Sequence, residues 1–456
     1  MPKKFTLFAL IASSLYLFYI AAIADVTIRH DAISYQQLGT MLYQGQWLEY
    51  FTTGPNREPM YPLFVATAMH AADIAHIPFT SMLMIMQVLL LLATQLLMVA
   101  IMKHLKISDA ISGLIVLYSA FSPTLNNFTF IPWSELLSMP LILWAVLLLR
   151  RAWEEPRWWL GLLLALNFIA LTLTKGIFEL AFAFCFLPFV IRAFLLWKNK
   201  NPAMLGRCVL VLVLWALPFT VAINGYKSLN KIYNGRFTIT DRGAWALYGG
   251  TAKRMGPLTS QDFIAFLATV PHKELCYALL DKDKCFYWGE DVASDSLGRE
   301  KIGELISKKF TGQNLDKELI RQALTKILQN PAQAVFMEFV ESFKIFFWEA
   351  FTKPAYVIYP LWVEHLYNYN PLYYTLRYGV GILSILAFAT ALILIVRRKQ
   401  IPVALGMTVL MVLAYLIPCS LFMIVSRYTV PLGPLHLILI AFLFQSIHLK
   451  FLDRKE

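Results

Sequence analysis

Charged residues are scarce in this sequence. Asp, Glu, Lys and Arg together make up 15% of its 456 residues, while apolar residues make up 58%. Soluble domains carry about 25% charged residues and about 45–50% apolar ones. The mean hydropathy of +0.59 points the same way. This composition argues against one large soluble core and predicts repeated membrane spans.

Signature motifs of nucleotide-dependent proteins and zinc proteases are absent. The sequence has no Gly-x-x-x-x-Gly-Lys-Ser/Thr loop, no dinucleotide-binding glycine fingerprint and no His-Glu-x-x-His pair,. These absences disfavour an ATP-driven pump and an enzyme that uses a soluble nucleotide. We also find no internal repeat and no low-complexity tract.

Cysteines are few, and their locations differ. Cys185, Cys208 and Cys419 lie within apolar segments, where cysteine usually serves as a small packing residue,. Cys276 and Cys285 lie close together in a more polar region. In an oxidising compartment they could form a disulfide, and two free thiols are the alternative. The sequence does not decide between these two interpretations.

Long apolar runs, in contrast, are abundant. Ten segments are long enough to cross a hydrocarbon layer of about 30 Å. They cover residues 5–24, 80–102, 107–124, 134–150, 158–174, 177–196, 203–223, 375–396, 401–424 and 432–448. We therefore expect an all-α polytopic membrane protein with about ten transmembrane helices, interfacial helices in the first external loop and a helical external region.

Short basic clusters follow every second apolar segment. They are Lys103–Lys106, Arg150–Arg157, Lys198–Lys200, Arg397–Lys399 and the tail from Lys450 to Lys455. Lys3 and Lys4 precede the first segment. All these clusters fall on one side if both termini are cytoplasmic, as the positive-inside rule requires. The net charge of +12 therefore reflects membrane orientation and does not indicate a nucleic-acid partner.

Two weakly apolar segments, Tyr61–Ile77 and 332–352, carry polar or charged residues at about helical spacing,. If only one of them crossed the membrane, some basic clusters would move to the outer side. We therefore expect both to lie in the outer interface with the apolar face toward the lipid. The first apolar segment has a rival interpretation as a cleaved signal peptide. We favour its retention because 5–24 is longer than the usual signal core.

The apolar segments divide the chain into three parts. Residues 1–223 form an N-terminal membrane module, and its first external loop, 25–79, holds the candidate catalytic residues. Residues 224–374 form a helical external region, and residues 375–456 form a C-terminal membrane module. In the external region, Leu315–Gln329 has the pattern of a helix, and Gly249-Gly250 is typical of a turn.

The first external loop places a carboxylate and an arginine just outside the membrane. Asp31 could take a proton from an attacking hydroxyl as a general base. The alternative role of Asp31 is to cap the helix expected over 32–43. Arg57 suits a lipid phosphate because a guanidinium matches two phosphate oxygens at once. An ion pair with Glu58 or Glu49 is the alternative for Arg57.

Other ionisable side chains lie near the outer ends of later spans. Glu135 opens the fourth span, Lys175 lies in the hairpin between the fifth and sixth, and Arg427 with Tyr428 follows the ninth. Each of them alone suits snorkelling or helix capping. Together they place acids and bases at one membrane depth. Such a set could transfer a group from a lipid phosphate, because a carboxylate activates the acceptor while cations stabilise the departing phosphate.

Two further groups of residues have simpler explanations. His70, Asp73 and His76 could bind a metal, but the two histidines point about 120° apart on a helix. The polar face of an interfacial helix explains them better, so we assign no metal ligands. A divalent ion held with Asp31 stays an open alternative. The aromatic residues between Tyr356 and Tyr378 suit an interface belt or, alternatively, a groove for a lipid tail or a sugar.

The motifs of the external loop resemble those of a known family. Asp31-Ala32-x-x-Tyr35, Gly45 and Arg57-Glu58-Pro59-Met60-Tyr61-Pro62-Leu63-Phe64 resemble the first external loop of the GT-C superfamily of membrane glycosyltransferases. The likeness is to the protein-mannosyltransferase-like group, glycosyltransferase family 39, which includes aminoarabinose transferases acting on lipid A. Also similar are Ser134-Glu135, Leu173-Thr174-Lys175-Gly176 and Arg427-Tyr428-Thr429-Val430-Pro431. The likeness covers most of the two membrane modules and does not extend to 224–374.

The resemblance implies an inverting transferase that moves a sugar from a polyprenyl-phosphate carrier to a glycan, lipid or protein acceptor. Asp31 would be the general base. The carrier phosphate would bind Arg57, Lys175 and Arg427, and the sugar or acceptor would contact Tyr35, Glu58, Tyr61, Glu135 and Tyr428. The enzyme would act in glycan biosynthesis in the bacterial inner membrane, on its periplasmic side. Ala32 stands where many members have a second carboxylate, which disfavours a paired-carboxylate metal site.

A transporter or flippase of a lipid-linked or anionic substrate is the main alternative, and a non-catalytic scaffold is a weaker one. Transporters usually place ionisable groups near the bilayer midplane, often with repeat symmetry. In this sequence the interiors of the spans are nearly free of charge, and acids and bases gather at the outer ends. The sequence therefore favours the enzyme.

Overall fold

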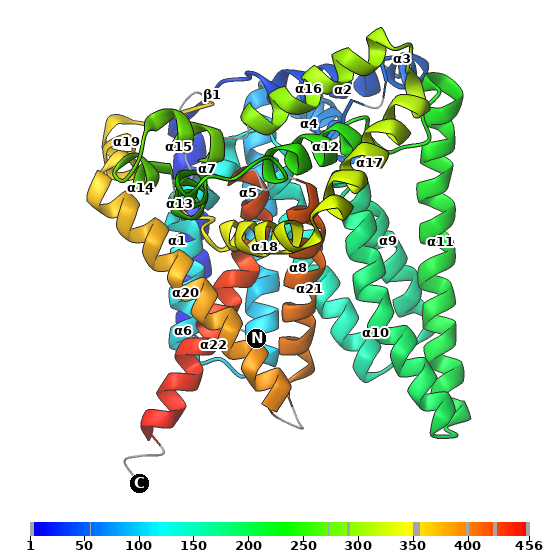
Figure 1. Ribbon diagram of the computed structural model, residues 1–456. Coiled ribbons are helices and arrows are strands. Elements are labelled where there is room, and N and C mark those ends of the chain that lie inside the picture. The colour runs from blue at the N-terminus through cyan, green and yellow to red at the C-terminus, as the bar shows by residue number, and fades with distance from the viewer. Residues whose placement is uncertain are drawn as a thin grey trace.

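The computed structural model describes residues 4–54, 56–271, 273–289, 292–349, 356–397, 401–422 and 426–452. This part of the chain is almost entirely helical (Figure 1). Its strands are β1 (Asp25–Val26) and β2 (Val357–Ile358), which pair antiparallel and join the first external loop to the end of the external region. The predicted all-α fold is confirmed.

Eight helices in the described residues are long and apolar enough to cross a membrane. They are α1 (Lys4–Ile23), α5 (Phe79–His104), α8 (Ser134–Glu154), α10 (Phe178–Lys198), α11 (Pro202–Asn234), α20 (Asn370–Arg397), α21 (Val403–Phe422) and α22 (Gly433–Leu452). Two shorter apolar helices, α6 (Asp109–Phe121) and α9 (Trp158–Thr174), complete the ten predicted segments. The chain is a polytopic membrane protein.

One predicted span is shorter than expected. The segment 107–124 ends at Phe121, and a new helix, α7 (Pro123–Phe130), begins after Ser122. Proline cannot continue a helix because it lacks an N–H, but it suits the first helical turn. The Ser122 hydroxyl accepts a hydrogen bond from the Leu125 N–H and caps α7. Every residue of α7 is buried.

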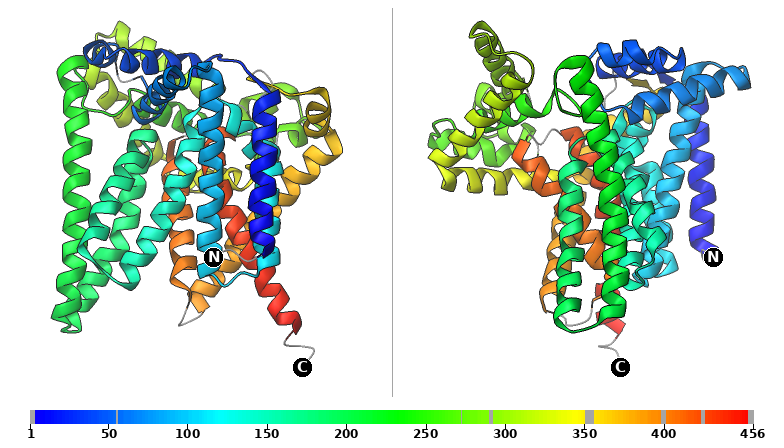
Figure 2. Two further views of the ribbon diagram at one scale, coloured as in Figure 1. Left: turned by 180° about the vertical axis from the view of Figure 1, so that it is seen from behind. Right: turned by 90° about the vertical axis from the view of Figure 1, so that its right-hand side faces the viewer.

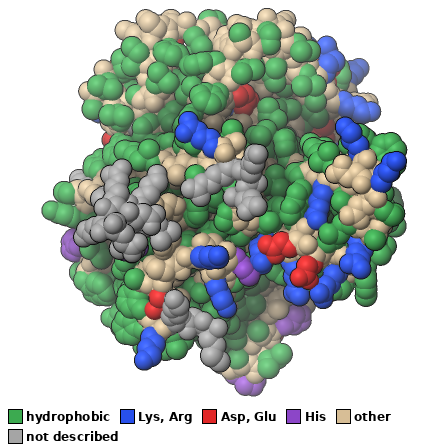
Figure 3. Space-filling model, turned by 90° about the horizontal axis from the view of Figure 1, so that it is seen from below, with side chains coloured by type: hydrophobic (Ala, Val, Ile, Leu, Met, Phe, Trp, Pro, Cys, Tyr) green, Lys and Arg blue, Asp and Glu red, His purple; other side chains and the backbone are tan. Residues whose placement is uncertain are grey.

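The arrangement of the helices agrees with the charge pattern. Figures 1 and 2 show both ends of the chain at the lower end of the bundle, with the turn between α10 and α11. Viewed from below, this face carries many Lys and Arg side chains and few acids (Figure 3). By the positive-inside rule, the upper end is the one that we expect on the outer side of the membrane.

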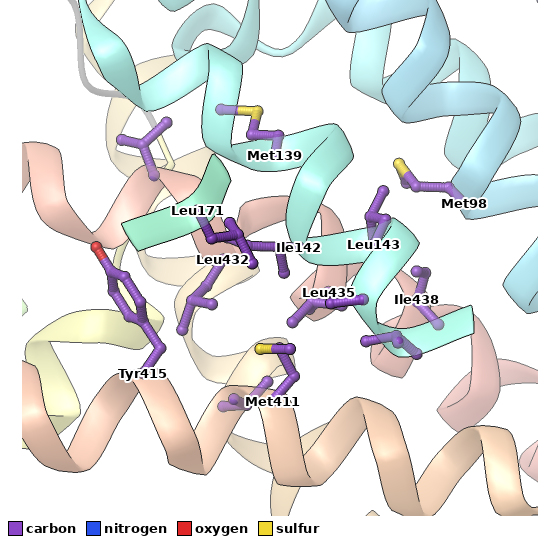
Figure 4. Close-up of a cluster of buried hydrophobic side chains, with 14 of the residues drawn as sticks. Met98, Met139, Ile142, Leu143, Leu171, Met411, Tyr415, Leu432, Leu435 and Ile438 are labelled. Carbon is purple, nitrogen blue, oxygen red and sulfur yellow. The ribbon is translucent and has the colours of Figure 1, made fainter. Parts of the chain in front are cut away.

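The core of the bundle lies between α5, α8, α9, α21 and α22. Figure 4 shows apolar side chains of these helices in contact, among them Met98, Met139, Leu143, Leu171, Met411 and Ile438. Small residues let neighbouring helices approach closely in membranes. At Gly161 of α9, a Cβ atom would lie 2.6 Å from the Val211 carbonyl oxygen of α11. In the outer helices α1, α10 and α11 fewer than a third of the residues are buried, and many apolar side chains are exposed, as lipid contact requires.

Three helices of the first external loop lie across the outer end of the bundle (Figure 1): α2 (Asp31–Tyr43), α3 (Trp47–Thr52) and α4 (Met60–Ala75). The helix expected at Tyr61–Ile77 is α4, whose C-cap His76 has left-handed backbone angles. α2 and α4 are packed together, and a Cβ on Gly39 would overlap Val65 at 2.5 Å.

The external region follows α11, which continues beyond the boundary we place at 223. Its elements are α12 (Gly243–Arg254), α13 (Ser260–Thr269), α14 (Lys273–Tyr277), α15 (Lys282–Gly289), α16 (Val292–Ser307), α17 (Gly312–Gln329), α18 (Pro331–Ser342), η1 (Phe343–Phe346) and α19 (Leu361–Asn368). A short helix, η2 (Ser426–Leu432), lies between α21 and α22. The predicted helix Leu315–Gln329 is part of α17. The helix expected over 332–352 ends at Ser342, and 350–352 lie outside the described residues.

Two expectations for this region are resolved by the structure. Cys276 and Cys285 form a disulfide that links α14 to α15, so the paired interpretation is confirmed. The turn predicted at Gly249-Gly250 is wrong, because both glycines lie inside α12. They are needed for close packing: a Cβ on Gly250 would lie 1.9 Å from the Phe422 carbonyl oxygen at the end of α21.

Candidate functional site

Asp31 lies where two distant parts of the chain meet. It is the first residue of α2, and the preceding His30 is the N-cap, so the capping interpretation of Asp31 is wrong. Its carboxylate instead accepts hydrogen bonds from Arg57 and Arg427, each at 2.5 Å. The alternative in which Arg57 pairs with Glu58 or Glu49 is also wrong, because its ion pair is with Asp31.

The ion pairs continue into the bundle as a chain of alternating charges. The Arg427 Nε atom lies 3.9 Å from Glu135 Oε1, and the Lys175 ammonium donates to the same oxygen at 2.9 Å. The Glu135 side chain is only 3% exposed. This row of ion pairs contains three cations and two carboxylates, in the order Arg57, Asp31, Arg427, Glu135 and Lys175. The row therefore carries one net positive charge. The buried Glu135 carboxylate within it needs its cationic partners, because an unpaired buried charge is strongly destabilising.

Aromatic rings hold the cations in place. The Arg57 guanidinium lies 5.0 Å from the ring centre of Tyr35, and the Arg427 guanidinium lies 5.1 Å from that of Trp133. The Lys175 ammonium lies 4.7 Å from the ring centre of Tyr428. Partly desolvated cation–π contacts of this kind contribute about 1–2 kcal/mol each. They fix the direction of the charged groups.

The other predicted residues support this cluster. Glu58 accepts a hydrogen bond from the Gly176 N–H at 3.0 Å and so holds the hairpin that carries Lys175. Tyr61 is fully buried and donates a hydrogen bond to Gln87 at 2.8 Å. Its ring packs edge-on against Tyr35 at 4.8 Å. Tyr61 therefore supports Tyr35 from behind.

A cavity of about 420 Å³ lies against the cluster, at the outer end of the bundle. Pockets of about 300–1,000 Å³ are typical of small-molecule sites. Of the predicted site residues, those that line it are Tyr35, Arg57, Glu58, Glu135, Lys175, Arg427 and Tyr428. Asp31 and Tyr61 do not line it. Asp31 is next to the cavity through its ion pairs with Arg57 and Arg427, which both line it.

The remaining walls of the cavity combine apolar and charged side chains. Leu180 of α10 and Cys419 and Phe422 of α21 form an apolar side. Tyr415 lies between the cavity and the core shown in Figure 4, and its hydroxyl donates to the Tyr428 carbonyl at 2.9 Å. Gly243 and Ala246 of α12 also line the cavity. The site can therefore accommodate an apolar chain beside its charged groups.

Three charged residues of the cavity were not among our predicted site residues. Lys227 of α11 forms an ion pair of 2.5 Å with Glu179 of α10, and Arg242 lies at the start of α12. Lys227 follows a span on the outer side, where basic residues are rare. That departure from the charge rule is a signal in the sequence that could have identified it.

The electrostatics of the cluster favour an anion. Burial disfavours the charged form of Asp31, but the charges and hydrogen bonds of Arg427 and Arg57 outweigh it and lower the pKa of the carboxyl well below its usual range. Among the described residues, the buried Nε atoms of Arg57 and Arg427 and the Trp133 Nε1 atom donate no hydrogen bond. Buried donors usually have partners. These unused donors indicate a site for an additional acceptor.

The described residues contain no cluster of three or more His, Cys, Asp or Glu side chains suited to a metal. In α4, Asp73 accepts a hydrogen bond from the Tyr43 hydroxyl, and the His70 ring packs 4.6 Å from that of Tyr43. The aromatic residues after Tyr356 pack on the bundle, with Tyr356 4.9 Å from Trp133 and Tyr367 hydrogen-bonded to Tyr16.

No protein-family model matches the sequence, and no curated protein matches it either. The class of protein that the fold defines is a polytopic membrane protein.

Proposed function

We propose that this protein is a membrane glycosyltransferase that moves a sugar from a polyprenyl-phosphate carrier to an acceptor on the outer side of the membrane. The observation that carries the proposal is that three cations, the buried Arg57 and Lys175 and the partly buried Arg427, line one cavity together with apolar side chains. A phosphate attached to a hydrocarbon chain combines these two chemistries. The resemblance of the external loop implies the same substrate class.

The carrier phosphate is the natural acceptor for the unused donors of the cluster. Guanidinium groups bind phosphate oxygens in pairs and stay charged at all physiological pH values. The Nε atoms of Arg57 and Arg427 supply two such donors. The Lys175 ammonium, which contacts Glu135 at the end of the row of ion pairs, supplies a further positive charge. The prenyl chain would follow the apolar side formed by Leu180 and Phe422 toward the lipid.

The reaction is a single displacement at the anomeric carbon. The acceptor oxygen forms a bond to this carbon while the bond from the carbon to the phosphate oxygen breaks. The acceptor proton moves to the Asp31 carboxylate, and the electron pair of the broken bond stays on the carrier phosphate. The cations stabilise that charge in the transition state, where such stabilisation accelerates the reaction most.

Asp31 cannot act as a strong base while both arginines hold it, because its pKa is lowered. Phosphate binding would draw the guanidinium groups toward the carrier and weaken their hold on the carboxylate. Carrier binding would therefore precede proton transfer. This order keeps the base inactive until the donor is present.

The remaining residues of the cluster would position the sugar. The rings of Tyr35 and Tyr428 offer apolar faces, and Glu58 and Glu135 offer hydrogen-bond acceptors. Tyr61 would act indirectly through Tyr35. The acceptor could be a glycan, a lipid or a protein, and the bacterial inner membrane, with the cavity facing the periplasm, is the location that fits this chemistry.

Native mass spectrometry of the purified protein in nanodiscs tests the carrier. We expect a bound polyprenyl phosphate, or its sugar-loaded form, in preparations given polyprenyl phosphate. Arg57→Gln should reduce this binding about tenfold or more, because it removes a charge-assisted pair. Arg299→Gln is the matched control, since Arg299 is an exposed arginine on α16 that forms an ion pair with Asp295 and does not line the cavity.

Binding of ordinary phospholipids alone, even with polyprenyl phosphate added, would reject the carrier-dependent proposal. Equal carrier binding by wild type and Arg57→Gln would remove Arg57 from the phosphate site. Movement of the carrier across the bilayer without any sugar transfer, unchanged in Asp31→Asn, would identify a flippase instead.

A further inference from the structure

The helix α18 presents an apolar face that no part of the described chain covers. Val335, Phe336 and Phe339 point outward, and Val335 is 71% exposed. On the opposite side of the helix, Met337 and Glu341 are buried. The exposed positions follow the spacing i, i+1, i+4, which places them on one face.

The neighbouring helix α13 repeats this pattern. Phe263, Ile264 and Leu267 are exposed at the same spacing, while Ala265 and Phe266 are buried. The rings of Phe263 and Phe336 are stacked with their centres 5.6 Å apart, which joins the two faces. The six exposed side chains of α13 and α18 form one patch, called here the α13–α18 face, and none of them is charged. Contiguous exposed apolar patches usually mark an interaction surface.

The position of α18 is set by the end of a membrane span. Arg254, at the end of α12, is buried and donates hydrogen bonds to Glu341 of α18 at 3.0 Å and to the Leu421 carbonyl of α21 at 2.8 Å. It also pairs with Glu338 at 3.1 Å. A single buried guanidinium thus ties α18 to the outer end of α21.

Figure 2, on the right, shows the external region extending sideways beyond the spans, with α18 on its underside. Because α18 is tied to the end of α21, this underside lies level with the outer part of the membrane. The space below it, beside the spans, is occupied by lipid in any bilayer that the bundle crosses.

Aromatic contacts also connect the end of α18 to a membrane span through the buried Phe346. Phe339 packs 5.2 Å from Phe343, Phe343 lies 6.2 Å from Phe346, and Phe346 lies 5.3 Å from Phe388 of α20. On α20, Ile382 and Leu386 are exposed as a lipid-facing helix requires. Apolar ring contacts therefore connect α18 to α20, whose exposed side chains face lipid.

We propose that the α13–α18 face inserts into the outer leaflet and anchors the external region to the membrane surface. The partner is the acyl part of the lipid. The charged residues of α18, Glu338 and Glu341, are directed away from that face toward Arg254. Interfacial helices combine an apolar face in the acyl boundary with polar groups turned away from it.

The anchor has a consequence for the cavity. At one end of α12, Gly243 and Ala246 line the cavity. At its other end, Arg254 forms the ion pairs that hold α18. Lipid contact at α18 therefore helps to hold α12 over the cavity. This inference does not depend on the reaction that takes place there.

Fluorescence quenching by lipid tests the insertion. Val335→Cys and Leu267→Cys are labelled separately with bimane, and each protein is placed in phosphatidylcholine nanodiscs with or without a nitroxide on an upper acyl carbon. The native cysteines do not interfere, because Cys276 and Cys285 are paired and Cys185, Cys208 and Cys419 are buried. Ile306→Cys on α16 is the control, since Ile306 is 53% exposed and lies outside the α13–α18 face.

We expect the nitroxide lipid to quench bimane at both 335 and 267 by at least about half and to leave bimane at 306 nearly unchanged. Equal quenching at all three positions, or none at 335 and 267, would overturn the proposal. Disulfide cross-linking of Val335→Cys between two copies, with no quenching, would identify a second copy as the occupant. Two labelled positions guard against misfolding at one of them, and matching unfolding temperatures confirm that the variants fold.

Discussion

Asp31→Asn separates the electrostatic role of this side chain from its proposed chemical role. The change keeps the shape of the side chain and removes one negative charge from between Arg57 and Arg427. Hydrogen bonds to charged groups are worth about 1.5–3 kcal/mol each. Asp31 is 29% exposed, and asparagine keeps one acceptor oxygen. We therefore expect the free energy of unfolding of the unliganded protein to fall by about 1–3 kcal/mol.

Although Asp31→Asn should lower the stability of the unliganded protein, it should raise the affinity for the carrier. A fixed negative charge about 5 Å from a phosphate costs on the order of 3 kcal/mol at an effective dielectric constant of about 20. Solvent screening reduces this cost, so removing the Asp31 charge should tighten the binding of polyprenyl phosphate about tenfold, which corresponds to about 1.4 kcal/mol. Sugar transfer should fall at least about 100-fold, because an amide cannot accept the proton.

The assay is a titration of polyprenyl phosphate into nanodiscs, combined with thermal unfolding and a transfer measurement on the same preparations. The matched control is Asp25→Asn, since Asp25 is an exposed acid in the same loop. Weaker carrier binding by Asp31→Asn, or transfer at the wild-type rate, would refute the competition between carboxylate and phosphate that underlies the mechanism.

The pH dependence of stability gives a second check on Asp31. Its folded-state pKa is lowered, so its contribution to stability is fully present above the ordinary pKa of about 3.9 and is lost only as the pH falls further, through the lowered value,. Between about pH 5 and pH 8, wild type and Asp31→Asn should therefore differ in stability by a constant amount.

Three further predictions concern stability. Lys175→Met removes the 2.9 Å partner of the buried Glu135, so the free energy of unfolding should fall by about 3 kcal/mol, measured by thermal unfolding,. Reducing the bond between Cys276 and Cys285, which closes a loop over a sequence separation of 9, should cost about 2–3 kcal/mol, measured with and without reductant,. Burial raises the pKa of the Glu338 carboxyl to about 7 despite the opposing charge of Arg254, so stability should fall as the pH rises from about 4 to about 7, by up to about 3 kcal/mol, and Glu338→Gln should abolish this fall,.

Each of these predictions has a control. Lys227→Met breaks an ion pair with the half-exposed Glu179 and should cost less than about 1 kcal/mol, so equal losses for the two lysines would contradict the argument from burial,. Reductant should leave a variant that lacks Cys276 and Cys285 unchanged. A pH profile of Glu338→Gln identical to that of wild type would assign the titration to another group.

The sequence alone determined the membrane character of the chain and predicted its orientation. Apolar segments such as 158–174 are helices with the expected bounds, because hydrophobicity over about 20 residues is a local property that lipid enforces directly,. The basic clusters at Lys103–Lys106 and Lys198–Lys200 predict which side of the membrane each loop lies on, because Lys and Arg in short loops are also a local signal. Proline at 123 also carried a local signal, and our span prediction overlooked it.

The pairing of charges was decided only by the tertiary structure. Asp31 and Arg427 are separated by 396 residues, and no periodicity relates them. Sequence position placed Glu58 beside Arg57, yet the fold directs Glu58 to the Lys175 hairpin and Arg57 to Asp31. An ion pair forms where packed helices bring two charges within a few ångströms, so its partners depend on the whole arrangement. The same dependence on the whole arrangement explains why we did not predict the pairing of Lys227 with Glu179 or the packing of Gly249-Gly250 inside a helix. The helices themselves could be predicted from local pattern.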